Sequence, residues 1–268
     1  MKKFLDVPNL VTNIECASRI ALAPDYSGCS LVSVVEIVKQ KISELHLIGV
    51  PSLGVQGDIL IGGNCVTSVE AAAVSIGEFG PGPRFSYAYR NGHLKLYEST
   101  CPAIHSGLQA SEKGIPYMPM RGAIGSDIMD TRDTWLVQDN PFAEIPDRIV
   151  LVKAIKPDIA LFHCPLADIY GNVWIGVRRE LVTMAHASKK TLVTCEKIYK
   201  GNLLEDDQLA AGTISALYIS EISHAPLGAW PVGLFGCYST DIKEVNKYLE
   251  IAKSEGGFSS YVENFRAS

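Results

Sequence analysis

The most constraining feature of the sequence is the way its first fifty residues alternate between apolar runs and an amphipathic segment. Residues 19–24 and 45–50 are apolar runs of strand length, and a proline stops each of them. Between them, apolar residues recur at the three- and four-residue spacing of a helix, at Leu31, Val34, Val35, Val38 and Ile42. This β-α-β order with short loops predicts an α/β fold with an open, mostly parallel sheet and helices on both faces.

The same alternation continues along most of the chain. We predict further strands at residues 66–74, 115–119, 149–152, 158–163, 190–195 and 214–222. We predict further helices at residues 58–61, 102–113, 178–188 and 241–254. No internal repeat, low-complexity tract or linker interrupts this pattern, so we expect a single domain spanning residues 1–268.

Three segments depart from the alternation. Asn91-Gly92 separates residues 85–89 from 94–97, which favours a β-hairpin there. Residues 77–84 are rich in glycine and proline and predict a loop, as does the segment 135–148. The tail from residue 256 onward is polar and weakly patterned.

Composition excludes several classes of protein. There are 24 Lys and Arg residues against 29 Asp and Glu, a net charge of -5, which argues against binding of nucleic acid or of an anionic membrane. The 47% apolar content excludes intrinsic disorder. No apolar run approaches the roughly 20 residues of a membrane span, and residues 1–13 lack a signal-peptide core. We therefore expect a cytoplasmic protein.

The cysteines and histidines give no sign of a disulfide framework or a metal site. The seven cysteines are odd in number and form no Cys-x-x-Cys pair, so we expect free thiols, most of them buried. His163 and Asp168 have ligand chemistry but lack a third partner, so we predict no metal site. Asp168 begins an Asp-x-x-Gly-Asn run, whose plain interpretation is a turn.

Glycine clusters and one arginine are the candidate ligand-binding residues. Ser52 and Gly54 follow a predicted strand, and Gly62, Gly63 and Asn64 follow a short helix. Exposed backbone N–H groups at such places can hold an anion, although tight turns explain the glycines equally well. No dinucleotide or P-loop fingerprint is present.

A second pair of binding candidates follows the predicted strand at 115–119. Arg121 precedes a glycine-containing loop with Ser126, a suitable place to hold a carboxylate or phosphate. The alternative for Arg121 is a surface or subunit-interface ion pair.

Glu98 is the candidate catalytic residue, since it lies where a strand ends and a helix begins. A carboxylate there can act as an acid, a base or an orienting group. The alternative is a solvated carboxylate, with the nearby Thr100 capping the helix.

In this order, the clusters resemble the A (alpha) chain of class I coenzyme A transferases, most closely its glutaconate-type branch. The matching runs are residues 58–64, 107–110, 114–121, 125–127 and 158–172. Judged from the motifs and their order rather than from an alignment, the resemblance covers roughly residues 18 to 235. Its more specific parts are the Pro-x-Arg-Gly loop at Arg121 and the Asp-x-x-Gly-Asn run.

The resemblance implies a fold shared with certain sugar-phosphate isomerases, and an enzyme completed by another chain. Such alpha subunits pair with a homologous beta subunit, often as α2β2, to move coenzyme A from an acyl-CoA to a carboxylic acid. The acyl-CoA is a substrate, and no other cofactor is implied. The catalytic glutamate belongs to the beta subunit, and its Glu-Asn-Gly context is absent here. Residues 23–29, with Ser27 and Gly28, replace the family's glycine-rich loop and remain candidates for substrate binding.

Two other functions stay open on the sequence. A sibling branch of the family hydrolyses a carbon–carbon bond in cyclic acyl-CoA compounds, using an alpha-subunit carboxylate in the loop where Glu98 lies. Alternatively, the absence of a self-contained triad or metal site is typical of a non-catalytic ligand-binding or scaffold subunit.

Overall fold

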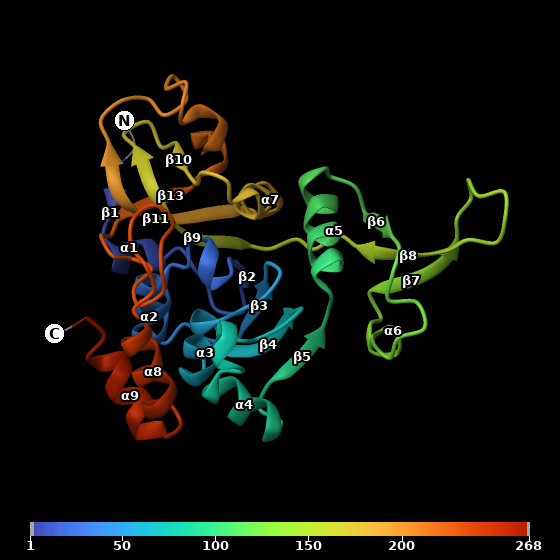
Figure 1. Ribbon diagram of the computed structural model, residues 1–268, viewed down its shortest axis with the longest axis horizontal. Coiled ribbons are helices and arrows are strands. Elements are labelled where there is room, and N and C mark those ends of the chain that lie inside the picture. The colour runs from blue at the N-terminus through green and yellow to red at the C-terminus, as the bar shows by residue number, and fades with distance from the viewer. Residues whose placement is uncertain (1–2, 267–268) are drawn as a thin grey trace.

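A computed structural model describes residues 3–266 of the chain (Figure 1). Residues 1, 2, 267 and 268 lie outside the described residues, so the predicted domain, 1–268, is described except for two residues at each end. A ten-stranded sheet forms the main body. Eight strands form its continuous path, in the order β1 (Phe4–Leu5), β13 (Glu221–His224), β11 (Lys190–Tyr199), β9 (Ile159–Asp168), β2 (Arg19–Leu22), β3 (Leu45–Gly49), β4 (Val66–Ala71) and β5 (Lys95–Glu98).

All neighbours on this path are parallel, which confirms the predicted open, mostly parallel sheet. Two short strands, β10 (Val173–Trp174) and β12 (Thr213–Ile214), pair antiparallel beside β9. The helices are α1 (Val7–Val11), α2 (Leu31–Lys39), α3 (Val55–Gly62), α4 (Pro83–Arg90), α5 (Cys101–Glu112), α6 (Ile128–Thr131), α7 (Arg179–Ala187), α8 (Ile242–Ile251) and α9 (Glu255–Glu263).

Both faces of the sheet are covered, as predicted. Because side chains alternate along a strand, Ile159 and Leu161 of β9 enter one apolar cluster, while Ala160 and Phe162 enter the other. Helices α1, α2, α3, α8 and α9 contribute to the first cluster, and α5 and α7 to the second. The continuous apolar runs in the central strands reflect this double burial.

A second, three-stranded sheet projects from the main body beside α5 (Figure 1). It is antiparallel, in the order β6 (Tyr117–Met120), β8 (Arg148–Lys153) and β7 (Trp135–Asp139). We call this sheet with its connecting loops, residues 117–153, the small lobe. One face packs Trp135, Val150 and Val152 against α5, and the other stays open.

The predicted hairpin around Asn91-Gly92 is wrong. Residues 83–90 form α4, with Pro83 in its first turn, and only the second segment becomes a strand. Asn91 caps the end of α4, and Gly92 follows with a φ of 69°. An Asn-Gly pair therefore ended a helix here, since a left-handed residue suits a helix C-terminus as well as a hairpin turn.

Three other predicted boundaries are corrected. The segment 135–148 contains β7, which takes its partner from β8 rather than from any local pattern. The strand at 214–222 is divided by a short 3-10 turn, where the Ser215 side chain accepts from the Leu217 N–H. The tail contains α9, which Ser254 caps by accepting from the Gly257 N–H at 3.1 Å.

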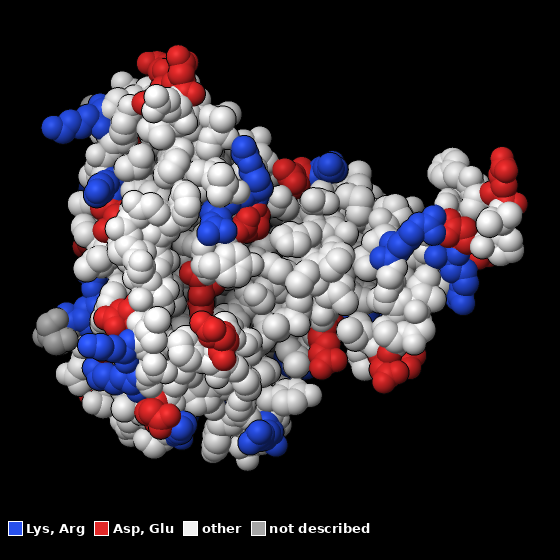
Figure 2. All heavy atoms as spheres, viewed as in Figure 1, with Lys and Arg blue, Asp and Glu red and all other residues white. Residues whose placement is uncertain are grey.

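The distribution of surface charge and the state of the cysteines are those expected from the composition. Acidic and basic side chains are interspersed over the face shown in Figure 2. All seven cysteines are free, and four of them are buried, at Cys29, Cys65, Cys164 and Cys195. Among the described helices, none is both long and apolar enough to cross a bilayer. Within residues 3–266, no cluster of three or more potential ligands from His, Cys, Asp or Glu is placed to hold a metal.

Candidate functional site

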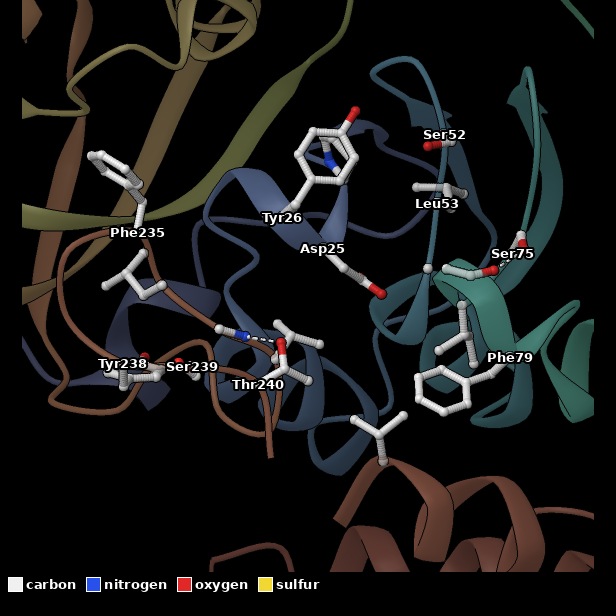
Figure 3. A pocket seen from close by; sticks show the side chains of 18 of the residues that line it. Asp25, Tyr26, Ser52, Leu53, Ser75, Phe79, Phe235, Tyr238, Ser239 and Thr240 are labelled. Atoms are coloured by element: carbon white, nitrogen blue, oxygen red, sulfur yellow. Dashed lines mark hydrogen bonds between the residues drawn. The ribbon is translucent and has the colours of Figure 1, made fainter. Parts of the chain in front are cut away.

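A cavity of about 900 Å³ lies at the carboxyl ends of β2, β3 and β4 (Figure 3). Pro24 and Asp25 follow β2, the segment 52–54 follows β3, and the segment 73–77 follows β4. The segment 232–240 covers the opposite side. Carboxyl ends of parallel strands are where open α/β sheets bind ligands, so this cavity is the candidate site.

Asp25 is held beside the cavity by the start of α3. It begins a 3-10 helix, and its Oδ2 accepts from the Val55 backbone N–H at 3.0 Å. A Cβ at Gly54 would overlap this carboxylate, so only glycine permits the approach. The Asp25 Oδ1 is buried and has no hydrogen-bond partner among the described residues.

The environment of Asp25 favours its neutral form. Burial raises the pKa of Asp25 to about 6, although the hydrogen bond from Val55 opposes this, and the charge of Asp58 adds to it. Figure 3 shows Asp25 between Tyr26 on one side and Ser75 and Phe79 on the other. A carboxyl group in this position can change protonation near neutral pH while remaining part of the cavity wall.

The rest of the described wall is mainly apolar. Among the described residues that line the cavity, Asp25 and Arg178 are the two with formally charged side chains. Apolar walls come from Leu53, Ile76, Phe79, Leu234 and Val245. Such a cavity suits an apolar group that carries a small number of polar atoms.

The structure brings two of the predicted binding residues into this cavity and places two behind it. Ser52 and Gly54 line it directly. Ser27 donates a hydrogen bond to Glu180, and the Gly28 carbonyl accepts from the His163 N–H at 2.7 Å. Ser27 and Gly28 border a space of about 10 Å³ next to Arg178.

The other glycine cluster lies away from the cavity. Gly62 ends α3, and Gly63 and Asn64 lead into the amino end of β4. A Cβ at Gly62 would crowd Arg84 and Phe258, so this glycine permits close packing of α3 against α4 and α9. The structure does not bring this cluster together with Ser52 and Gly54.

Glu98 lies at the same edge of the main sheet as the cavity, but it does not line the cavity. It is exposed at the carboxyl end of β5, one strand beyond β4. It lines a neighbouring space of about 240 Å³, and Ala73 contributes to both spaces. The nearby Thr100 caps α5 by accepting from the Ala103 N–H at 3.3 Å.

Arg121 and Ser126 belong to the small lobe. Arg121 makes a two-pronged ion pair with Asp147, with one N–H···O distance of 2.7 Å. Ser126 is exposed and donates to the Ala123 carbonyl at 2.6 Å. Neither residue lines the cavity, and the ion pair matches the structural alternative given for Arg121.

The Asp-x-x-Gly-Asn run forms the turn that its plain interpretation indicates. The Asp168 Oδ1 accepts from the N–H groups of Tyr170 and Asn172, both at 2.9 Å. His163 is buried and bonds instead to Thr194 at 2.8 Å and Glu196 at 3.2 Å. His163 and Asp168 therefore each have protein partners, and their side chains do not form a shared site.

Sequence reasoning missed the two charged groups of the cavity. Asp25 lay within the loop at residues 23–29, where a carboxylate directly after a strand was an available signal. Arg178 stood at a predicted helix start, which gave no reason to single it out. The segment 232–240 has no regular pattern, and its position depends on tertiary packing.

Comparison with known proteins gives relatives that include a transferase subunit, a hydrolase subunit and an uncharacterized protein. The chain is 26% identical over 246 residues to the alpha-type (A) chain of glutaconate CoA-transferase from Acidaminococcus fermentans, covering 85% of this chain and 76% of that one. It is 24% identical over 190 residues to the cholesterol ring-cleaving hydrolase IpdA subunit of Rhodococcus jostii, covering 68% and 64%. An uncharacterized Archaeoglobus fulgidus protein is 27% identical over 239 residues, 88% of this chain. The chain spans about half, 52%, of that protein.

The solved structures agree on the fold. The crystal structure of the Acidaminococcus fermentans glutaconate coenzyme A-transferase superposes with a TM-score of 0.90 at 23% identity, covering 98% of this chain and 88% of that chain. No protein-family model matches the sequence. The sequence relatives and this shared fold identify the chain as a member of the class I coenzyme A transferase family, similar to its alpha subunits.

Proposed function

We propose that the chain is the alpha subunit of a heteromeric coenzyme A transferase, which moves CoA from an acyl-CoA to a carboxylic acid. The observation that carries this proposal is an incomplete cavity. Its described lining contains no glutamate, lysine or histidine. A cavity that suits an acyl group but offers no glutamate of its own is what a subunit needs if the reactive glutamate comes from a partner.

The partner in this proposal is a homologous beta subunit. The open face of the small lobe exposes Tyr117 and Leu136, and the loop that joins β7 to β8 exposes Phe142 and Ile145. These apolar side chains belong to the part of the chain that projects from the main body. Exposed apolar patches of this kind are typical of interfaces with another protein. Two such pairs would give the α2β2 assembly.

In this reaction the covalent steps occur on the partner chain. Its glutamate attacks the thioester carbonyl, CoA leaves as a thiolate, and an acyl anhydride forms. The thiolate then attacks the glutamyl carbonyl, which releases the first acid and gives a glutamyl-CoA thioester. Attack by the second acid reverses the sequence. This chain binds the acyl group against the walls formed by Leu53, Phe79 and Leu234 and excludes water from the anhydride.

A second candidate function, hydrolysis of a ring carbon–carbon bond in a CoA thioester, is favoured by Glu98. This carboxylate is exposed at the same sheet edge as the cavity. In that case water would replace the acceptor acid, and an alpha-subunit carboxylate would be essential.

Trapping the covalent intermediate tests the two functions against each other. The chain is co-expressed with the subunit encoded beside it, incubated with acyl-CoA and treated with borohydride, which reduces a glutamyl thioester to an alcohol. Mass analysis should locate the reduced glutamate on the partner chain, both in the wild type and in the Glu98→Gln variant. An active complex without any trapped glutamate, together with loss of activity in Glu98→Gln, would favour hydrolysis instead.

A further inference from the structure

One wall of the cavity is formed by a segment without regular secondary structure. Residues 225–241 join β13 to α8, and this fully described segment contains no helix or strand apart from one isolated bridge. We call these residues the cover segment. Residues 232–240 line the cavity, and Figure 3 shows Phe235 and Tyr238 across it from Phe79. Since few internal bonds fix such a segment, its position depends on contacts with the main body.

A buried carboxylate on β11 holds the cover segment at two points. Glu196 is 8% exposed, and its two carboxylate oxygens accept from the Leu227 N–H at 2.8 and 3.0 Å. The Tyr238 hydroxyl donates to the same carboxylate. Leu227 has a left-handed φ of 58°, which a leucine adopts only where other contacts hold it. Glu196 therefore fixes both the start of the cover segment and a residue that lines the cavity.

His163 orients this carboxylate from the neighbouring strand, β9. Its Nε2 lies 3.2 Å from a Glu196 oxygen, and its Nδ1 lies 2.8 Å from the Thr194 hydroxyl. Burial lowers the pKa of His163, which favours the neutral imidazole. Burial raises the pKa of Glu196, but hydrogen bonds from His163 and Leu227 outweigh burial and leave that pKa below its ordinary value. The imidazole Nε2–H therefore donates to an ionised carboxylate, and Nδ1 accepts from Thr194.

Other contacts hold the first half of the cover segment independently of Glu196. The Gly228 carbonyl accepts from the Val32 N–H at 3.1 Å, and Leu234 is buried in the first apolar cluster. These contacts would remain if the carboxylate were removed. Its loss should therefore loosen Tyr238 and the residues beside it rather than unfold the chain.

We infer that Glu196, oriented by His163, is a positioning residue for the apolar group that the cavity binds, because it fixes the cover segment in the shape that completes the wall. Charge-assisted hydrogen bonds are roughly twice as strong as neutral ones, so an ionised carboxylate is suited to holding an irregular segment. A ligand gains affinity from walls that are already in place, since ordering them on binding costs free energy. The inference goes beyond the proposed function, because a transferase and a hydrolase would both need this wall in position.

Hydrogen–deuterium exchange of the full chain tests this role without a ligand. In Glu196→Ala, peptides covering residues 232–240 should exchange at least tenfold faster than in the wild type, while peptides from β2 and β9 stay unchanged. Glu196→Gln should give a smaller increase, because its amide oxygen can still accept from the Leu227 N–H. The matched control is Glu250→Gln, which removes a charge from an exposed position on α8 and should leave the exchange of the cover segment unchanged.

Calorimetric titration of the full chain links the cover segment to ligand binding. Hexanoate and acetate carry the same carboxylate and differ in their apolar chain, so the ratio of their affinities reports contact with the apolar walls. The wild type should bind hexanoate at least tenfold more tightly than acetate. Glu196→Ala should lose this preference, and Glu196→Gln should keep part of it. Tyr238→Phe should also reduce the preference, since it removes the bond to Glu196 and keeps the ring.

Several results would overturn the inference. Exchange of residues 232–240 that is unchanged in Glu196→Ala would do so, as would faster exchange spread equally over the main sheet. An unchanged preference for hexanoate in Glu196→Ala, or equal or absent binding of both acids by the wild type, would also do so. If Glu196→Ala does not fold, Glu196→Gln and Tyr238→Phe decide by the same criteria. None of these readouts requires turnover, so a lack of CoA transfer by the assembled complex would count against the proposed function alone.

Discussion

The two sheets of the molecule differ in how many of their faces are covered. The ten-stranded sheet has an apolar cluster on each face, so its strands are buried within the chain itself. The small lobe buries one face, through Trp135, Val150 and Val152, and leaves Tyr117 and Leu136 exposed on the other. The main sheet is therefore complete on its own and carries the cavity, whereas the lobe presents a surface suited to a partner.

The largest expected effect lies in the core of the main sheet. Phe162 is 0% exposed, so Phe162→Ala should destabilise the chain by about 3–5 kcal/mol through lost burial and a residual cavity. Leu136 on the small lobe is 64% exposed, and Leu136→Ala should change stability by less than about 0.5 kcal/mol. Urea unfolding of the isolated chain measures both. Similar losses in the two variants would contradict the comparison.

A buried ion pair ties the two sheets together and gives the next largest effect. Arg132, at the entrance to β7, bonds to Glu70 on β4, and both are buried. Removing one partner leaves a buried charge, so Arg132→Met should cost about 3 kcal/mol. Limited proteolysis should then cut the small lobe first. Cleavage of the main body at the same rate would show that the pair does not anchor the lobe.

This ion pair should also weaken in acid. Burial raises the pKa of Glu70, but the nearby His46, whose Nε2 lies 3.8 Å from the carboxylate, and the charge and hydrogen bond of Arg132 outweigh burial and leave that pKa below its ordinary value. A lowered carboxylate pKa contributes stability that is present above the unfolded-state pKa and is lost as the pH falls through the folded-state value. In Glu70→Gln the acid-dependent loss of stability below about pH 4.5, the ordinary value, should be smaller.

Asp25 should give the main sheet a pH dependence of the opposite sign. Since its pKa rises from 3.8 to about 6, the folded chain binds a proton more tightly than the unfolded chain does. Stability should therefore fall by up to about 2 kcal/mol as the pH rises from about 4 to about 6. Asp25→Asn should remove this slope, which unfolding curves at several pH values would show. The slope should persist in Asp147→Asn, because that carboxylate lies on the small lobe against the exposed Arg121.

The smallest effect on stability is expected on the open face of the small lobe. Leu136→Asp should alter the free energy of unfolding by less than about 0.5 kcal/mol, yet weaken association with the partner at least tenfold. Leu217→Asp is the control, because Leu217 is 90% exposed and lies outside the small lobe. Analytical ultracentrifugation distinguishes the two variants. Equal weakening by both would remove the small lobe as the docking surface.

The contrast between the main sheet and the small lobe also explains which elements could be predicted from the sequence. Strands such as β2 and β3 were predictable, because burial on both faces gives continuous apolar runs. The small lobe was only partly predictable, since β7 acquires its pairing from β8. The hairpin prediction failed at Asn91-Gly92, because the pair fits a helix end as well as a turn.

For the candidate site, local sequence patterns pointed to the segment after β3 and to little else of the cavity wall. Ser52 and Gly54 follow β3 directly, where the strand-end rule expects a ligand, and both line the cavity. Their role in binding stays a prediction. Gly62 and Gly63 form a second glycine cluster, but they lie at the C-terminal end of α3, where glycine permits close packing. Arg178 and Phe235 meet only through tertiary folding, and no spacing in the sequence relates them.

The most direct test of the account is the rate of CoA transfer by a fixed amount of this chain as its partner subunit is added. The account predicts no transfer by the chain alone, and a rate that rises with added partner and levels off at a one-to-one ratio. Transfer by the purified chain alone, at the rate of the complex, would contradict the claim that the reactive carboxylate comes from another polypeptide.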